Sequence, residues 1–161
     1  MGAPITLPIR VIVAAGDTFR HIVSDGLSQS REIVLAGEAN DLSALYAVLD
    51  NVKAHLVLLD ADHFGVATLD AVHQLGRIAP TCRILIVADD ESDNLAMNAL
   101  REGAHGHATK NAGLWEMLPR ALRTVASGVT FISPRMAGHI LDEIQSIRHS
   151  PGKPNPPLPS H

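Results

Sequence analysis

Leu56-Val57-Leu58-Leu59-Asp60 is the stretch of this 161-residue chain that decides the fold. Four apolar residues in a row, without polar alternation, are typical of a strand that is buried on both faces of a parallel sheet. Asp60 places one carboxylate at the carboxyl end of this strand, where ligands and chemistry gather in open α/β sheets. The stretch therefore predicts both a buried strand and a candidate functional residue.

Short apolar runs of the same kind recur along the chain and are separated by helical patterns. The runs that predict strands are residues 9–14, 33–36, 56–59, 84–87 and, more weakly, 105–109. Apolar residues at spacings of three and four predict five helices between and after these runs. The helical faces span residues 19–27, 42–52 after an Asp41 cap, 66–78 before Pro80, 95–100 between a Ser92 cap and Gly103, and 114–125 before Gly128.

Five strands that alternate with five helices predict an α/β fold, in which helices cover both faces of a parallel sheet. Parallel strands joined by right-handed crossovers all point the same way, so the loops that follow them share one edge. We therefore expect residues 14–17, Asp60, residues 88–89 and Lys110 to lie together at the carboxyl edge of the sheet. Periodicity alone leaves the strand order open.

Composition narrows the classes of function. An apolar content of 46% and a net charge of −4 describe a globular domain with a sizeable core and do not favour a nucleic-acid-binding surface. The apolar runs are too short to span a bilayer, and residues 1–8 lack the pattern of a signal peptide. The single cysteine, Cys82, cannot form an internal disulfide. These features predict a cytoplasmic protein without a membrane partner.

A further segment follows the fifth helix. Ser133 and Pro134 predict a helix N-cap followed by proline at the first helical position, and the apolar spacing continues to a helix end near His149. Residues 150–161 contain five prolines, which predicts an extended linker or tail. We therefore expect a main domain over residues 1–130, a linker helix over residues 131–149 and a proline-rich tail over residues 150–161.

Five segments of the chain resemble the receiver domain of response regulators, and the pattern fits the LuxR-type (NarL/FixJ-like) subfamily. They are residues 9–14, the run ending at Asp60, residues 83–87, the Gly-Ala-x-Gly-x-x-x-Lys segment at 103–110 and the Ser-Gly-x-x-Phe-Ile-Ser-Pro segment at 127–134. The last two are the most specific, and the likeness covers residues 9–148. The resemblance implies a doubly wound five-stranded parallel sheet in the flavodoxin-like order 2-1-3-4-5, flanked by five helices and followed by an extra C-terminal helix.

The resemblance also implies roles for two residues. Asp60 matches the phosphoacceptor aspartate of receivers, and Lys110 matches the lysine that pairs with the phosphoryl oxygens. Receivers carry two adjacent acidic residues after the first strand to hold Mg²⁺, and these positions read Ala15 and Gly16 here. The candidate phosphorylation site therefore lacks the acidic pair that its family relies on.

Two further family positions differ as well. The hydroxyl residue at the end of the fourth strand is replaced by Ala88, and the switching aromatic residue of the fifth strand is replaced by His107. A carboxylate about 4 Å from a dication gains about 8 kcal/mol of gross Coulomb energy at an effective dielectric of about 20. The loss of two such ligands weakens Mg²⁺ binding by about tenfold or more, even when most of that energy cancels against desolvation. We therefore expect no cofactor, weak or lost Mg²⁺ binding, and absent or inefficient phosphorylation at Asp60.

These features together predict a degenerate receiver that is a signalling module and not an enzyme. We expect it to act as a homodimer or through a sensor kinase or another regulatory protein. In LuxR-type regulators the helix that matches residues 134–149 leads to a DNA-binding domain, and these residues contain none. Contact with DNA is therefore expected only through a domain outside this chain. A working, phosphorylation-dependent receiver is the first alternative.

Two further classes of protein are alternatives. The motif Asp60-Ala61-Asp62 resembles the Asp-x-Asp nucleophile motif of haloacid-dehalogenase-like phosphatases, but it falls on the third strand, and Phe64 stands where threonine or valine is usual. A dinucleotide-binding domain needs a glycine-rich turn after the first strand, where only Gly16 is present. The nine histidines, His63, His105 and His107 among them, lack the spacing of a metal site and are expected on the surface and in loops.

Overall fold

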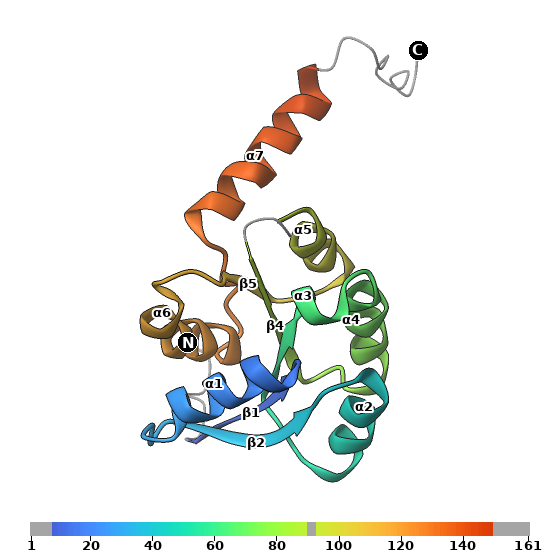
Figure 1. The fold of residues 1–161 in the computed structure, drawn as a ribbon. Coiled ribbons are helices and arrows are strands. Elements are labelled where there is room, and N and C mark those ends of the chain that lie inside the picture. Colours follow the sequence, from blue (N-terminus) through green and yellow to red (C-terminus); the bar gives the residue numbers. More distant parts are fainter. Residues whose placement is uncertain (1–7, 90–92, 150–161) are drawn as a thin grey trace.

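The computed structural model describes residues 8–89 and 93–149, and its strands form a five-stranded sheet (Figure 1). The pairings between neighbouring strands are all parallel. In chain order the strands are β1 (Ile9–Ala14), β2 (Ile33–Ala39), β3 (Leu56–Asp60), β4 (Arg83–Ala88) and β5 (Gly106–Thr109). Their order in the sheet is β2-β1-β3-β4-β5, which confirms the doubly wound fold. The order reverses between β1 and β3, and ligands bind beside such a switch point in related folds.

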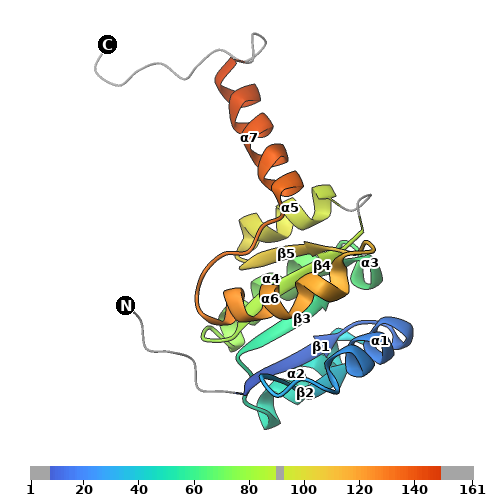
Figure 2. The ribbon, with the colours of Figure 1, turned by 90° about the vertical axis from the view of Figure 1, so that its left-hand side faces the viewer.

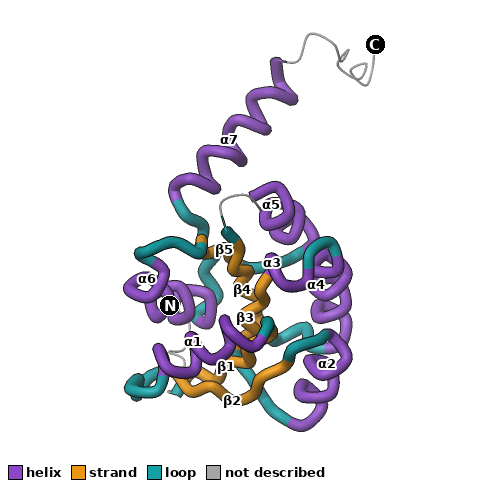
Figure 3. The backbone as a smooth tube through the Cα atoms, in the orientation of Figure 1, coloured by secondary structure: helices purple, strands orange, loops and turns teal. Residues whose placement is uncertain are grey.

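Helices cover both faces of the sheet, as the tube in Figure 3 shows. The described residues form α1 (Asp17–Leu27), α2 (Leu42–Asn51), α3 (Ala61–Phe64), α4 (Ala67–Ile78), α5 (Asp93–Glu102), α6 (Leu114–Ala126) and α7 (Pro134–His149). Helices α1 and α6 cover one face, and α2, α4 and α5 cover the other. In both Figure 1 and Figure 2, α7 projects away from the rest of the molecule.

Successive residues of β3 pack into two separate apolar cores. Val57 and Leu59 belong to the core that α2, α4 and α5 share, whereas Leu56 and Leu58 belong to the core that α1 and α6 share. The whole strand is buried, Asp60 included. This double burial explains the unbroken apolar run, because neither face of the strand meets water.

Four predicted helix ends, at Asp41, Gly103, Gly128 and Ser133, agree with the structure. The Asp41 side chain accepts a hydrogen bond from the Ala44 N–H at 2.7 Å and caps α2. Gly103 and Gly128 have φ values of 121° and 94°, a backbone region that favours glycine, and they follow α5 and α6. The Ser133 hydroxyl accepts from an N–H in the first turn of α7. The predicted Ser92 cap and the proline-rich tail lie outside the described residues.

Three expectations about the elements were wrong. The sequence predicted no helix between Asp60 and Val66, but the short helix α3 begins directly after β3, so the described residues contain one helix more than predicted. Val66 and Ile78 were expected on the buried face of α4 and are exposed. Val66 precedes the first turn of that helix and Ile78 is its last residue, so neither lies over the sheet. Strand β2 continues to Ala39, which pairs with Ala14 after an irregularity in the register.

None of the helices within residues 8–89 and 93–149 is both long enough and apolar enough to cross a membrane.

Candidate functional site at the carboxyl edge of the sheet

The structure brings Asp60 and Lys110 into direct contact. The Lys110 ammonium donates to Asp60 Oδ1 at 2.7 Å, and the Asp60 side chain is only 4% exposed. Strand β4 lies between β3 and β5, and the Lys110 N–H donates to the Ala88 carbonyl at 2.9 Å, so the chain after β5 stays at this edge. The contact therefore follows from three parallel strands that end together, as the sequence led us to expect.

Asp62 is a third member of this site, and the sequence did not identify it as one. Its Oδ2 lies 3.2 Å from the Lys110 ammonium and accepts a hydrogen bond from the Asp89 N–H at 2.9 Å. The Asp60 Oδ1 accepts from the Asp62 N–H at 3.1 Å and so caps α3, which turns Asp62 back towards the lysine. The Asp-x-Asp spacing was the available signal, because an aspartate that caps a helix brings residue i+2 close to itself. We call Asp60, Asp62 and Lys110 the carboxylate–lysine cluster.

The lysine of the cluster also lies over an aromatic ring. The Lys110 ammonium is 4.5 Å from the centroid of the Phe19 ring, which α1 provides. Such a contact stabilises a partly exposed cation by about 0.5–2 kcal/mol. Phe19 is itself packed against Trp115, with ring centroids 6.0 Å apart. The ammonium is therefore held by two carboxylates and one ring and is not extended into solvent.

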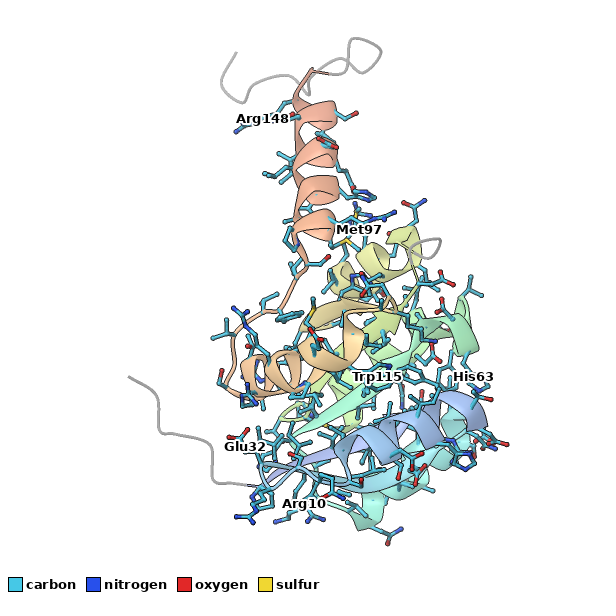
Figure 4. All side chains as sticks on the ribbon, turned by 60° about the vertical axis from the view of Figure 1, so that its left-hand side comes forward. Arg10, Glu32, His63, Met97, Trp115 and Arg148 are labelled. Carbon is cyan, nitrogen blue, oxygen red and sulfur yellow. The ribbon has the colours of Figure 1, made fainter. Side chains whose placement is uncertain are left out.

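The positions that match the acidic pair of receivers carry no oxygen-bearing side chain. Ala15 is fully buried, and its N–H donates to the Ala39 carbonyl at 3.0 Å. Gly16 faces the His63 imidazole so closely that a Cβ at this position would lie 3.1 Å from His63 Nδ1. His63 Nε2 lies 2.8 Å from the Asn40 carbonyl oxygen, and Figure 4 shows His63 at this edge of the molecule. An imidazole thus stands next to the place where a side chain of residue 16 would project.

Asp17 does not replace the missing pair. Its carboxylate is exposed and forms an ion pair with Arg20 one turn further along α1, and Arg20 also reaches Glu38 at 3.4 Å. Asp17 nevertheless borders the same shallow pocket of about 420 Å³, together with Gly16, Thr18, Phe19, Ile22, His63 and the cluster.

The donor set does not fit a Mg²⁺ ion. Mg²⁺ requires several carboxylate and phosphate oxygens with water in a near-octahedral arrangement. Both carboxylates of the cluster are engaged by the Lys110 ammonium, and Ala15 and Gly16 supply no oxygen ligand from their side chains. Within the part of the chain that the structure describes, no group of three or more histidine, cysteine, aspartate or glutamate side chains could hold a metal ion.

The two remaining family positions lie next to the cluster or within the sheet. Ala88 is fully buried at the end of β4, where its methyl group offers no hydrogen bond to a ligand. His107 lies within β5, in the segment that was predicted as the fifth strand, but it is fully buried, so the expectation that the histidines lie on the surface and in loops was wrong for this residue. Its backbone N–H donates to the Phe131 carbonyl at 2.8 Å, which joins β5 to the segment before α7.

His105 is a second histidine with a structural role. The ring Nδ1 of His105 accepts a hydrogen bond from the Ile84 N–H at 3.0 Å, and the backbone N–H of His105 donates to the Ile84 carbonyl at 2.8 Å. Burial, helped by the nearby Arg83 guanidinium, lowers the pKa of His105 below its ordinary value. The neutral ring is therefore favoured, and it ties the start of β5 to β4.

Comparison with known proteins gives sequence relatives and structural neighbours. No protein-family model matches the chain. The response regulator GacA of Pseudomonas protegens is 34% identical over 130 residues, which cover 81% of this chain and 58% of GacA. The response regulator GacA of Pseudomonas viridiflava is 32% identical over 80% of this chain and 60% of its own length. The chain thus spans less than two thirds of the length of these curated relatives.

Solved structures support the fold. The LuxR-family two-component response regulator from Aurantimonas sp. SI85-9A1 matches with a TM-score of 0.76 and 21% identity over 87% of this chain and 99% of that chain. The sequence relatives in turn decide the family. They place the chain in the response-regulator family, in which it forms a receiver domain.

Proposed function

We propose that this receiver is degenerate and regulates through protein contacts, with phosphorylation at Asp60 absent or inefficient. One observation carries the proposal. The Lys110 ammonium lies 2.7 Å from Asp60 Oδ1 and 3.2 Å from Asp62 Oδ2, while Ala15 and Gly16 stand in place of the acidic pair. The Lys110 ammonium thus offsets one of the two negative charges of the cluster, and both carboxylates share it as their cationic partner.

Phosphoryl transfer to Asp60 would have to disrupt this arrangement. The attacking oxygen would come from a carboxylate whose Oδ1 already accepts from Lys110 and from the Asp62 N–H. Charge on the phosphoryl group is normally neutralised by metal ions and positioned donors. Here the lysine is shared between two carboxylates, and Ala88 has no hydroxyl group with which to bind a phosphoryl oxygen. Both features favour an inert site.

We propose that this chain is the regulatory part of a LuxR-type transcription regulator in the cytoplasm. Among the structural neighbours, RcsB is seen as two dimers bound to two parallel DNAs. For this chain we propose a homodimer, with contact to DNA through a domain outside these residues and with a sensor kinase or another regulatory protein as a further partner. Signals would then act on dimer or partner contacts and not on the covalent state of Asp60.

A working receiver is the competing function, because the contact between Asp60 and Lys110 is present. A Mg²⁺ titration followed by the backbone amide signals of the cluster in NMR spectra separates the two. We expect no saturable shift for the wild-type chain at Mg²⁺ concentrations that saturate an ordinary receiver. Saturation of the wild-type signals in that range would contradict the proposal.

A variant that restores the acidic pair provides the matched control. We would combine Ala15→Asp and Gly16→Asp with His63→Ala, because the imidazole stands next to the Cβ of residue 16. This variant should bind Mg²⁺ at least about tenfold more tightly than the wild-type chain, since it regains two carboxylate ligands. Equal affinities in the two proteins would show that the acidic pair is not what the site lacks.

A further inference from the structure

Helix α7 carries an apolar face that the rest of the described chain does not cover. Leu141, Ile144 and Ile147 are 58%, 46% and 67% exposed. The helix is anchored at its base, where Met136 is fully buried and Ile140 packs against the core. Beyond that base it projects from the molecule, with Arg148 near its tip in Figure 4. Several exposed large apolar residues on one projecting helix are typical of a contact surface.

The apolar residues of α7 follow the spacing of a coiled coil. Ala137, Ile140, Ile144 and Ile147 are separated by three, four and three residues, which places them at the a and d positions of a heptad. We call these four residues the α7 seam. Three of them also form one wall of an open groove of about 350 Å³, lined by Met97, Leu100, Arg101, Ile140, Glu143, Ile144 and Ile147. The groove places part of the seam beside α5 and leaves it open to a second helix.

Two charged residues beside the seam indicate what this second helix is. In this register Glu143 occupies the g position of the first heptad, and Arg148 occupies the e position of the second. Side chains at g and e pair between the helices of a parallel coiled coil. Glu143 of one copy would therefore face Arg148 of another, and the two-fold symmetry would form this pair twice. In an antiparallel pair with the same seam, g positions face g positions and e positions face e positions, so Glu143 would not face Arg148 and both ion pairs would be lost.

A contact within the chain supports this assignment. Glu143 forms an ion pair with Arg101 of α5, which holds its carboxylate beside the seam. One oxygen of that carboxylate takes part in the pair, and the other can accept from a second guanidinium. Arg148 is exposed at the far end of the helix. The charges of Glu143 and Arg148 thus complement a second copy of the same helix in parallel orientation.

We propose that two copies of this chain dimerise through parallel α7 helices, with the α7 seam at the centre and Glu143 of each copy paired with Arg148 of the other. That the receiver acts as a dimer rests on the proposed function. The new statement is that the α7 seam is the dimer interface. A seam of two heptads gives a weak dimer, because short helices gain little from pairing. The parallel arrangement brings the ends of the two helices side by side, which suits a regulator that holds two output domains together.

Disulfide trapping with the full chain tests the orientation and the face. Ile147→Cys places a thiol in the seam, whereas Ser146→Cys places one on the same turn outside it. Native Cys82 does not compete, because it is buried and burial raises the pKa of its thiol to about 11. Under mild oxidation we expect Ile147→Cys to form a cross-linked dimer and Ser146→Cys to remain monomeric. Equal cross-linking of the two variants, or none, overturns the proposal.

A charge exchange gives a second, independent readout. Glu143→Arg and Arg148→Glu chains each bring like charges together in their own parallel dimer, but a mixture of the two forms both ion pairs. We expect the mixed dimer to be about tenfold more stable than either homodimer, measured by sedimentation of the single and mixed samples. No gain on mixing overturns the parallel arrangement. Neither experiment uses Mg²⁺ or a phosphodonor, so their failure would not contradict the proposal that Asp60 is inert. Conversely, phosphorylation of Asp60 would not contradict dimerisation through the α7 seam.

Discussion

At the scale of single residues, the molecule depends on how one lysine is shared. Lys110 joins Asp60, which is almost fully buried, to Asp62, which is partly exposed, and it stands over Phe19. An ion pair of this kind costs much to break from one side, because the remaining charge is left buried without compensation. The cluster is therefore a structural feature of the folded state as well as a candidate site.

Replacing the lysine tests this account. Lys110→Met should lower the free energy of unfolding by about 2–4 kcal/mol, because it leaves two neighbouring carboxylates without their shared cation. Chemical denaturation of the wild type and the variant measures the difference. Lys53→Met, at an exposed lysine, is the control and should change the stability by less than about 0.5 kcal/mol. A Lys110→Met chain as stable as the control would contradict the role given to the cluster.

His105 predicts a dependence of stability on pH. Its pKa in the folded chain is lowered by burial and by Arg83, so below its ordinary value of about 6.5 the unfolded state takes up a proton that the folded state does not. The contribution of His105 to stability is therefore complete above that value and is lost as the pH falls below it. Denaturation midpoints of the wild type at about pH 7 and about pH 5 measure the loss.

A pair of variants assigns this effect to His105. His105→Asn keeps an acceptor for the Ile84 N–H but does not titrate, so its stability should fall less between the two pH values. His21→Asn, at an exposed histidine of α1, should retain the wild-type dependence. Identical pH profiles for the two variants would assign the effect to other groups.

At the scale of elements, glycine plays opposite roles in β5 and α7. A Cβ at Gly106 would lie 2.8 Å from the Phe131 carbonyl oxygen and 3.0 Å from the Val125 side chain. The Phe131 oxygen belongs to the backbone, so it cannot move away without disturbing the segment that leads to α7. Gly138, inside α7, has nothing within 4 Å of the same ideal position. The space next to each glycine therefore predicts that a Gly→Ala substitution changes the stability of the domain in opposite directions at the two positions.

The matched pair Gly106→Ala and Gly138→Ala measures this difference. We expect Gly106→Ala to destabilise the domain by about 1–3 kcal/mol, because the added methyl group overpacks the contact between β5 and the Phe131 segment. Gly138→Ala should leave the domain unchanged or stabilise it by up to about 1 kcal/mol, since alanine is the better helix former. Thermal unfolding of both variants checks the signs. Stabilisation by Gly106→Ala would contradict the close approach.

The elements also show what the sequence could and could not predict. The five strands and the contact between Asp60 and Lys110 were predictable, because apolar runs mark buried strands and parallel strands end at one edge. The helix that carries Asp62 was not predictable, because a four-residue helix leaves no periodic pattern, although the Asp-x-Asp spacing was a signal for Asp62 itself. The contact of Phe19 with Lys110 depends on side-chain directions that the apolar spacing of α1 does not specify. The burial of His107 was missed because a polar residue type favours the surface.

At the scale of the whole molecule, the receiver architecture can be separated from the chemistry at its candidate site. The domain has the strand order, the switch point and the strand-end aspartate of a receiver. Two cores enclose the sheet, so the fold does not depend on the groups that a phosphorylation site needs. Dimerisation through α7, the helix that projects from the rest of the molecule, would also be independent of Asp60. The molecule can therefore lose phosphoryl transfer and keep its architecture.

The most direct test of this central claim is the intact mass of the wild-type chain after incubation with a small-molecule phosphodonor and Mg²⁺, with Asp60→Asn treated in parallel. We predict that wild type and Asp60→Asn give the same spectrum, with no prompt adduct of one phosphoryl group. A prompt adduct on the wild type that is missing from Asp60→Asn would contradict the account and establish a working receiver.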